Sequence, residues 1–489
     1  MTKGLFAKKS IQDLREEASN KKDGLKRSLT GWNLTLLGIG AIIGAGIFVL
    51  TGQGAALYAG PAVVYSFLFA ALICVFAAFC YAEFASLIPI AGGPYSYAYA
   101  TLGEFAAWTI GWVLTFEYLF SAATVAVGWS GYLSSFLGDF GLHLPEFLAS
   151  SPFAYDVATG WYKTGAIINL PSALLMAFIG GMIAIGIQAA ARLNSIMVAI
   201  KMIVILLFIG CGIFYVKSAN WVPFIPENTG AFGEFGFTGI LRGAGVVFFA
   251  YIGFDALSTL AQEARDPQKD MPVGMVSSLS VSAICYVLIA LVLTGIVSYK
   301  LLDTPAPFSV AVDALGPSFL WLRYVIKFGI LLAIPSVVLV MLLGQTRIVY
   351  TIAHDGLLPK AFGKVHKKYS TPFFNTIFLT GLGVVLCGLF PVGILGQLVS
   401  MGTLLAFLIV CFGVIVLRYK QPSLRRPFKV PFFPWIPLAG VFACLIQMIF
   451  LPRISWVLLV TWVFVGYIIY FSYGVRNSHL RKKRRLAKK

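Results

Sequence analysis

The sequence predicts an all-α polytopic membrane protein. Of its 489 residues, 59% are hydrophobic and only 11% are charged, and the mean hydropathy is +0.87. A chain this apolar lacks the polar surface that a soluble protein requires. A spanning helix needs about 20 mostly apolar residues, and the chain offers about twelve such stretches. We place them at 34–57, 62–88, 104–135, 171–190, 194–216, 239–262, 275–299, 318–345, 372–391, 394–418, 433–451 and 454–474.

The distribution of basic residues predicts the orientation in the membrane. Lys and Arg number 37 against 19 Asp and Glu, and they are concentrated in an N-terminal segment, 1–33, and a C-terminal tail, 475–489. An even number of spans puts both ends on one side, and the positive-inside rule makes that side cytoplasmic. We expect the tails to contact anionic lipid headgroups rather than nucleic acid. The expected location is the plasma membrane, here a bacterial inner membrane.

Two of the predicted spans carry glycines where a helix should continue. The first contains Gly38, Gly40, Gly44 and Gly46, and the sixth contains Gly253 before Asp255. Each glycine costs about 1 kcal/mol of helix propensity relative to Ala. Spans one and six hold corresponding places in a five-plus-five inverted repeat, whose broken helices meet near the midplane. The alternative is that these glycines only allow close helix packing, since Gly40 and Gly44 also fit that spacing.

The repeat interpretation divides the chain into segments. The first repeat covers 34–216 and the second covers 239–418, followed by two further spans in 433–474. A break inside the membrane exposes backbone groups that lipid cannot satisfy. An amino acid suits such a site: its carboxylate can meet free N–H groups at 44–47, and its ammonium can meet carbonyls near 249–252.

Lys201 is a candidate functional residue because an ionisable side chain inside a span is costly. It lies about seven residues into the fifth span, or about 10 Å deep at about 1.5 Å per residue. From there it can snorkel to the headgroups. Alternatively, its ammonium can meet carbonyls of the first break and the Ser336 hydroxyl, which lie at a comparable depth. A lysine held there away from water can give up its proton, so Lys201 is a candidate proton carrier.

Three carboxylates are further candidates. Glu117 heads a stripe of small polar residues at helical spacing, and it either binds a cationic substrate side chain or hydrogen-bonds a neighbouring helix. Asp255 either pairs with Lys201 or caps the inner half of the sixth span. Glu104 stands at the membrane edge, where an N-terminal helix charge is a sufficient explanation.

Catalytic and metal-binding patterns are not found in the sequence. The four histidines fall in predicted loops or tails, and no Cys/His ligand spacing or phosphate-binding loop occurs. We therefore expect a protein without enzymatic activity, cofactor or metal.

Several motifs resemble the amino acid, polyamine and organocation superfamily, in particular a compact bacterial form of its cationic amino acid transporter branch. The similarity extends from about residue 25 to 475 and is specific when its motifs are taken together. The motifs are Leu25-Lys26-Arg27-Ser28-Leu29, Gly38 to Gly52, Gly92-Gly93-Pro94-Tyr95-Ser96-Tyr97, Phe249-Ala250-Tyr251-Ile252-Gly253-Phe254-Asp255, Asp266-Pro267-Gln268-Lys269-Asp270-Met271-Pro272, Gly344-Gln345-Thr346-Arg347 and Asp355-Gly356-Leu357-Leu358-Pro359. His354 and Gln262-Glu263 depart from the family pattern.

The resemblance implies a leucine-transporter-like fold with the substrate between broken helices 1 and 6. It implies that Lys201 takes the place of the sodium ion of sodium-coupled relatives, and that Glu104 matches a glutamate of cationic transporters. The substrate would be held by the backbone of Ile43, Gly44, Ala45 and Gly46 at its carboxylate, and by carbonyls of Phe249, Ala250 and Ile252 at its ammonium.

The predicted function is import of cationic or small neutral amino acids, coupled to protons, by alternating access. The alternatives are an exchanger of amino acids or polyamines and a membrane sensor that binds without transporting. The preferred substrate, the oligomeric state and any small membrane-protein partner stay open.

Overall fold

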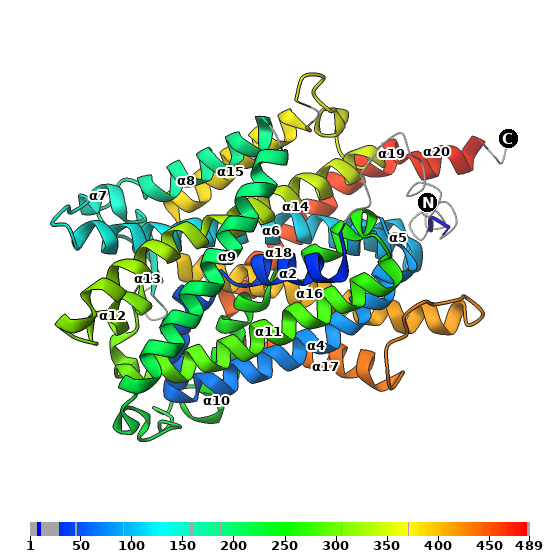
Figure 1. The fold of residues 1–489 in the computed structure, drawn as a ribbon. Coiled ribbons are helices and arrows are strands. Elements are labelled where there is room, and N and C mark those ends of the chain that lie inside the picture. The colour runs from blue at the N-terminus through cyan, green and yellow to red at the C-terminus, as the bar shows by residue number, and fades with distance from the viewer. Residues whose placement is uncertain are drawn as a thin grey trace.

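A computed structural model describes residues 7–10, 29–44, 46–90, 92–156, 160–185, 187–304, 306–369 and 371–486. The long helices run side by side in one bundle (Figure 1). Within these described residues, eight helical stretches are long and apolar enough to cross a membrane, and four shorter apolar helices accompany them. This is the architecture of a multi-pass membrane protein, as the sequence predicted.

The described α-helices begin and end as follows. They are α2 (Gly31–Ile42), α3 (Thr51–Gln53), α4 (Val63–Leu87), α5 (Gly93–Thr101), α6 (Glu104–Gly138), α7 (Glu146–Ala149), α8 (Leu170–Ile185), α9 (Ile187–Gly212), α10 (Gly236–Val247), α11 (Pro267–Ile296), α12 (Pro307–Asp313), α13 (Leu320–Ala333), α14 (Pro335–His354), α15 (Phe373–Leu389), α16 (Val392–Lys420), α17 (Trp435–Phe450), α18 (Arg453–Ile469), α19 (Val475–Asn477) and α20 (His479–Leu486). A small antiparallel hairpin, β1 (Phe153–Asp156) and β2 (Gly160–Lys163), pairs Phe153 with Lys163.

Interruptions divide some of the predicted spans. The stretch predicted at 318–345 corresponds to one candidate membrane span, Trp321–His354, in which Pro335 begins α14 directly after α13 and Ile334 between them keeps helical backbone angles. The stretch predicted at 34–57 begins at Gly31, stops at Ile42 and resumes as a π-helix at Gly46–Leu50.

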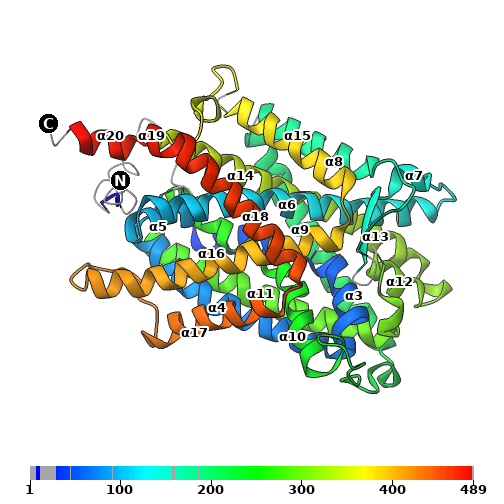
Figure 2. The same cartoon turned by 180° about the vertical axis from the view of Figure 1, so that it is seen from behind.

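The centre of the bundle is formed by α6, α11 and α16. Helix α11 packs against α2 and α4, and α6 packs against α14 and α16; Figure 2 shows α11 with α4, and α6 with α14 and α16, from behind. Gly38 lets α2 approach α11, because a Cβ there would lie 2.5 Å from Ser278 Oγ. The bundle thus places α2 beside α11 and α9, and the breaks of the chain lie inside it.

Segments from the two ends of the chain meet at one end of the bundle. The Lys9 ammonium lies 2.8 Å from Asp355 Oδ1, and the His479 N–H donates to the Asp355 carbonyl at 3.0 Å. Helices α7 and α12 lie at the opposite end (Figure 1). The segment around Lys9 and helix α20 therefore lie at the same end of the bundle.

Candidate functional site

The first break follows α2 in the middle of the bundle. Helix α2 ends at Ile42, Ile43 is extended with φ −75° and ψ 107°, and the chain is helical again from Gly46. Ile43 and Gly44 are buried, and Ala45 lies outside the described residues. Of the sequence-predicted carboxylate contacts, Ile43 and Gly44 thus fall on a buried, non-helical turn, and Gly46 begins the helix that follows.

The second break follows α10. A 3-10 helix covers Phe248–Tyr251, Ile252 is extended, and Gly253 has φ 126°, a value that strongly favours glycine. The chain then forms a 3-10 helix from Asp255 to Glu263. A Cβ on Gly253 would lie 2.7 Å from the Ala41 carbonyl oxygen, so this glycine also permits direct contact with α2.

The two breaks contact each other. A Cβ on Gly46 would lie 2.3 Å from Ala250 Cα, so only glycine allows this approach. The Tyr286 hydroxyl of α11 bridges the breaks, at 3.0 Å from the Ile42 carbonyl and 2.7 Å from the Ala250 carbonyl. The glycines thus do more than pack two continuous helices, because they bring together two interrupted backbones inside the protein.

Some backbone acceptors in this region already have partners. The Phe249 carbonyl accepts from the Ile252 N–H at 3.2 Å, and the Ala250 carbonyl accepts from Tyr286. A carbonyl oxygen has two lone pairs and can accept a second hydrogen bond. These predicted ammonium contacts therefore remain chemically available, although the substrate must share them with the protein.

Lys201 lies fully buried beside the first break. Its ammonium donates to the Gly40 carbonyl at 2.8 Å and to Ser336 Oγ at 2.9 Å, and Ser336 in turn donates to the Ala333 carbonyl. The lysine therefore joins α9, α2 and α14. These are the contacts that the depth of Lys201 predicted, and they exclude snorkelling in this structure. No carboxylate lies within ion-pair distance of Lys201 in the part of the chain that the structure describes.

Asp255 does not pair with Lys201 and instead binds the second break and α6. Its Oδ1 accepts from the Gly253 N–H at 3.1 Å, and its Oδ2 accepts from the Tyr118 hydroxyl at 2.8 Å. The side chain begins the inner 3-10 helix and faces α6, whereas Lys201 faces α2 and α14. The predicted pair is wrong because the two side chains have different partners.

Glu117 is buried on α6 without a hydrogen-bond partner for either carboxylate oxygen among the described residues. Helix α16 lies close behind it, since a Cβ on Gly402 would be 3.8 Å from Glu117 Cβ. Ser121 and Thr124, the next residues of the predicted stripe, are also buried. The stripe thus faces the interior of the bundle, and Glu117 lies between α6 and α16.

Comparison with known proteins identifies the family. The family model for amino acid permeases matches residues 29–474. The chain belongs to this family. The permease is 43% identical over 479 residues to the methylthioribose transporter of Bacillus subtilis, covering 98% of this chain and 99% of that relative. It is 43% identical over 483 residues to the branched-chain amino acid permease BcaP of the same organism, covering 99% and 100% of the two chains.

A more distant relative fits the branch that the motifs suggested. Cationic amino acid transporter 1 of Arabidopsis thaliana is 35% identical over 410 residues, covering 83% of this chain and 65% of the relative. Family membership makes the permease a membrane transporter of amino acids and not an enzyme. The predicted family and the general function are thus confirmed.

Glu104 lies away from the two breaks, at the end of the permease where the termini meet. Its carboxylate accepts from the Tyr99 and Tyr470 hydroxyls at 2.9 and 3.0 Å, and from Arg481 Nε at 2.6 Å. The Ser478 hydroxyl donates to it as well. Glu104 thus anchors the C-terminal segment to the start of α6, and this placement gives it a supporting role.

Sequence reasoning missed the two tyrosines that organise the breaks. Tyr286 bridges them from α11, and Tyr118 fixes Asp255 from α6. Both are fully buried. A tyrosine in an apolar span usually needs a partner for its hydroxyl, and that was the only signal available. The partners themselves are distant in sequence, so the helix packing was needed to find them.

Proposed function

We propose that the permease imports amino acids together with protons by alternating access. The observation that carries this proposal is the contact between two buried backbone breaks, at Gly46 and Ala250, beside a fully buried lysine. Discontinuous helices meeting inside a membrane bundle are the usual substrate site of secondary transporters. The proposal includes twelve spans, a leucine-transporter-like five-plus-five inverted repeat, and cytoplasmic termini whose basic residues contact anionic lipid.

The substrate would be recognised chiefly by backbone. Its carboxylate would bind N–H groups at Gly44, Ala45 and Gly46, following Ile43, near the positive end of the outer half-helix. Its ammonium would bind carbonyls of Phe249, Ala250 and Ile252. This recognition uses only the carboxylate and the ammonium that all amino acids share. The preference for particular substrate side chains must therefore arise elsewhere in the site.

Glu117 is the group we assign to that preference. A buried carboxylate without hydrogen bonds is costly unless it is neutralised or meets a cation. The ammonium or guanidinium of a cationic substrate would supply the cation, directly or through water, while a protonated Glu117 would accept small neutral amino acids. The branched-chain and cationic substrates named for relatives make both classes worth testing here, together with methylthioribose.

Lys201 and Ser336 would couple transport to protons. A charged Lys201 holds the Gly40 carbonyl and Ser336, and so ties α2 to α14. Loss of its proton removes the charge that strengthens these hydrogen bonds. The inner half of the first broken helix would then be released from α14, which links proton release to opening of the inner pathway.

Uptake into proteoliposomes tests the proposal. Labelled arginine, alanine and leucine are offered outside vesicles with an imposed inward proton gradient, and vesicles without a gradient are the control. We expect the gradient to stimulate uptake. Uptake that is equal with and without the gradient contradicts proton coupling, and uptake that requires amino acid inside the vesicle identifies an exchanger instead.

A further inference from the structure

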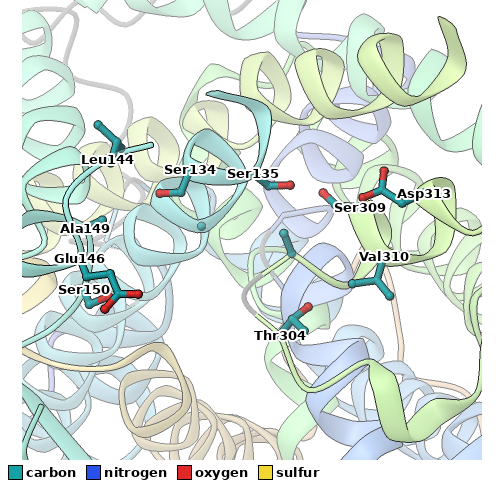
Figure 3. A pocket seen from close by; sticks show the side chains of 12 residues that line it. Ser134, Ser135, Leu144, Glu146, Ala149, Ser150, Thr304, Ser309, Val310 and Asp313 are labelled. Atoms are coloured by element: carbon teal, nitrogen blue, oxygen red, sulfur yellow. The ribbon is translucent and has the colours of Figure 1, made fainter. Parts of the chain in front are cut away.

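A pocket, here called the outer pocket, lies at the end of the bundle where α7 and α12 are found. It has a volume of about 410 Å³, is partly open, and is lined by the end of α6, the segment at α7, Thr304, and residues 306–313 including α12. This size is in the range of small-molecule sites. In Figure 3 the side chains of Ser134 and Ser135 lie across the gap from Thr304, Ser309 and Asp313.

The lining of this outer pocket is rich in groups that bind a cationic ammonium. Its charged residues are Glu146 and Asp313, and no Lys, Arg or His belongs to the lining. Asp313 Oδ1 pairs with Arg323 at 2.9 Å, whereas Glu146 has no ion pair among the described residues. The pocket thus has one carboxylate, on the exposed side chain of Glu146, without an ion pair among the described residues, and its lining also includes the hydroxyls of Ser134, Ser135, Ser150, Thr304 and Ser309.

Two hydroxyls of the outer pocket have no partner. Ser309 is only 4% exposed, and neither its Oγ nor Thr304 Oγ1 has a hydrogen bond in the described part of the chain. The Ser309 and Ser135 hydroxyls point toward one another across the gap (Figure 3). Buried hydroxyls normally have partners, so this arrangement indicates a polar ligand between α12 and α6.

Aromatic residues join α12 to the outer half of the first broken helix. Phe308, the neighbour of Ser309, packs on Phe48 with ring centroids 5.1 Å apart. Phe48 follows Gly46 by two residues, and its carbonyl accepts from the Tyr132 hydroxyl at 2.5 Å. Helix α12 thus has one face on the outer half of the first broken helix and another on the outer pocket.

We propose that the outer pocket is an external binding site for the primary ammonium group of amino acids and small amines, with Glu146 as its counter-ion and Ser309 as a hydrogen-bonding partner. The proposal rests on the proposed import of amino acids, whose external substrates carry this group. Because α12 covers the first broken helix, an occupant that bridges α6 and α12 would hold this cover in place, and its departure would free the cover to move.

The test counts the ligands bound per chain. Purified permease is titrated to millimolar concentration with a labelled amino acid that it transports, and separately with labelled ethanolamine, an amine without the carboxylate that the central site requires. We expect two amino acids and one ethanolamine per chain. In Glu146→Gln combined with Ser309→Val we expect one amino acid and at least about tenfold weaker ethanolamine binding, the loss for one charge-assisted hydrogen bond.

The matched control is Glu227→Gln, which removes an exposed carboxylate outside the pocket lining and should leave both counts unchanged. If the permease binds two amino acids per chain but no ethanolamine, the outer pocket takes external amino acids, and the part of the proposal that concerns free amines is wrong. The outer site is overturned if the wild-type permease binds only one amino acid per chain. It is also overturned if the double variant still binds two. An absence of both uptake and amino acid binding would instead overturn the proposed function.

A labelling experiment covers the case in which the double variant does not fold. Ser135→Cys places a thiol in the outer pocket of an otherwise unaltered chain. An external methanethiosulfonate reagent should modify this cysteine more slowly in the presence of saturating ethanolamine or amino acid. Unchanged modification in saturating amino acid contradicts the proposal.

Discussion

At the scale of single residues, Lys201 is the clearest candidate for function. Burial of a lysine without a carboxylate partner is costly, and hydrogen bonds to a carbonyl and a hydroxyl recover only part of that cost. If the side chain at position 201 only joined α2 to α14, an apolar side chain would do so without the cost of burying a charge. The arrangement therefore favours a transported or exchanged proton.

Lys201→Ala should abolish stimulation of uptake by the proton gradient while amino acid binding stays detectable, because the backbone breaks that hold the substrate are untouched. Gradient-driven uptake and equilibrium binding are measured on the same preparation. Lys300→Ala, which alters an exposed lysine, serves as the control and should behave like the wild type. Normal gradient stimulation in Lys201→Ala would show that another group carries the proton.

Gly46 makes a second prediction at this scale. Even the Cβ of alanine would lie 2.3 Å from the Ala250 backbone, so Gly46→Ala must push the two breaks apart. We expect a loss of about 1–3 kcal/mol in stability, as for overpacked sites, together with loss of amino acid binding. Thermal unfolding in detergent and ligand titration measure the two effects.

The control for Gly46 is Gly181→Ala in α8, where an added Cβ meets nothing within 4 Å. It should leave binding unchanged, since alanine is the better helix former. If Gly46→Ala binds amino acids as the wild type does, the contact between the breaks does not form the substrate site.

At the scale of elements, the extent of most spans was predictable and their partners were not. The predicted span at 104–135 corresponds to α6, which runs from Glu104 to Gly138, because uninterrupted hydrophobicity marks a long helix. The start of α14 at Pro335, inside the span at 318–345, was not predicted, although proline is a local signal. The pairing of Asp255 with Lys201 was wrong because depth along a helix says nothing about the direction in which a side chain points.

The link between α6 and the C-terminal segment also depends on packing between distant elements. Glu104 is fully buried, and among the described residues its ion-pair partner is Arg481 of α20. Neither the sequence separation nor the basic composition of the tail distinguishes Arg481 from its neighbours. The structure does, since this arginine alone reaches the buried carboxylate among the described residues of α20.

Arg481→Ala should destabilise the permease by about 3–5 kcal/mol, the cost of leaving a buried charge without its partner. Lys482→Ala, at an exposed neighbouring position, should change stability little. Adding Glu104→Gln to Arg481→Ala should restore part of the loss, because the charge is then removed. Thermal unfolding measures all three variants, and equal stability of Arg481→Ala and Lys482→Ala would contradict the structural role of Glu104.

At the scale of the whole molecule, the prediction concerns orientation. The segments around Lys9 and His479 both contact Asp355 at one end of the bundle, and α7 and α12, whose residues line the outer pocket, lie at the other (Figure 1). The basic terminal segments favour the cytoplasm, so Glu227 should face outside and Lys367 inside. Both are exposed, which makes each suitable for replacement by cysteine. Wild-type permease measures background labelling of its seven native cysteines, six of which are buried and one half-buried.

A membrane-impermeant thiol reagent should label Glu227→Cys in intact cells and Lys367→Cys only after permeabilisation. This outcome would place the outer pocket where external amino acids reach it first and Lys201 on the route of protons toward the cytoplasm. The opposite labelling pattern would put the outer pocket in the cytoplasm, and the direction assigned to coupled transport would then have to be reversed.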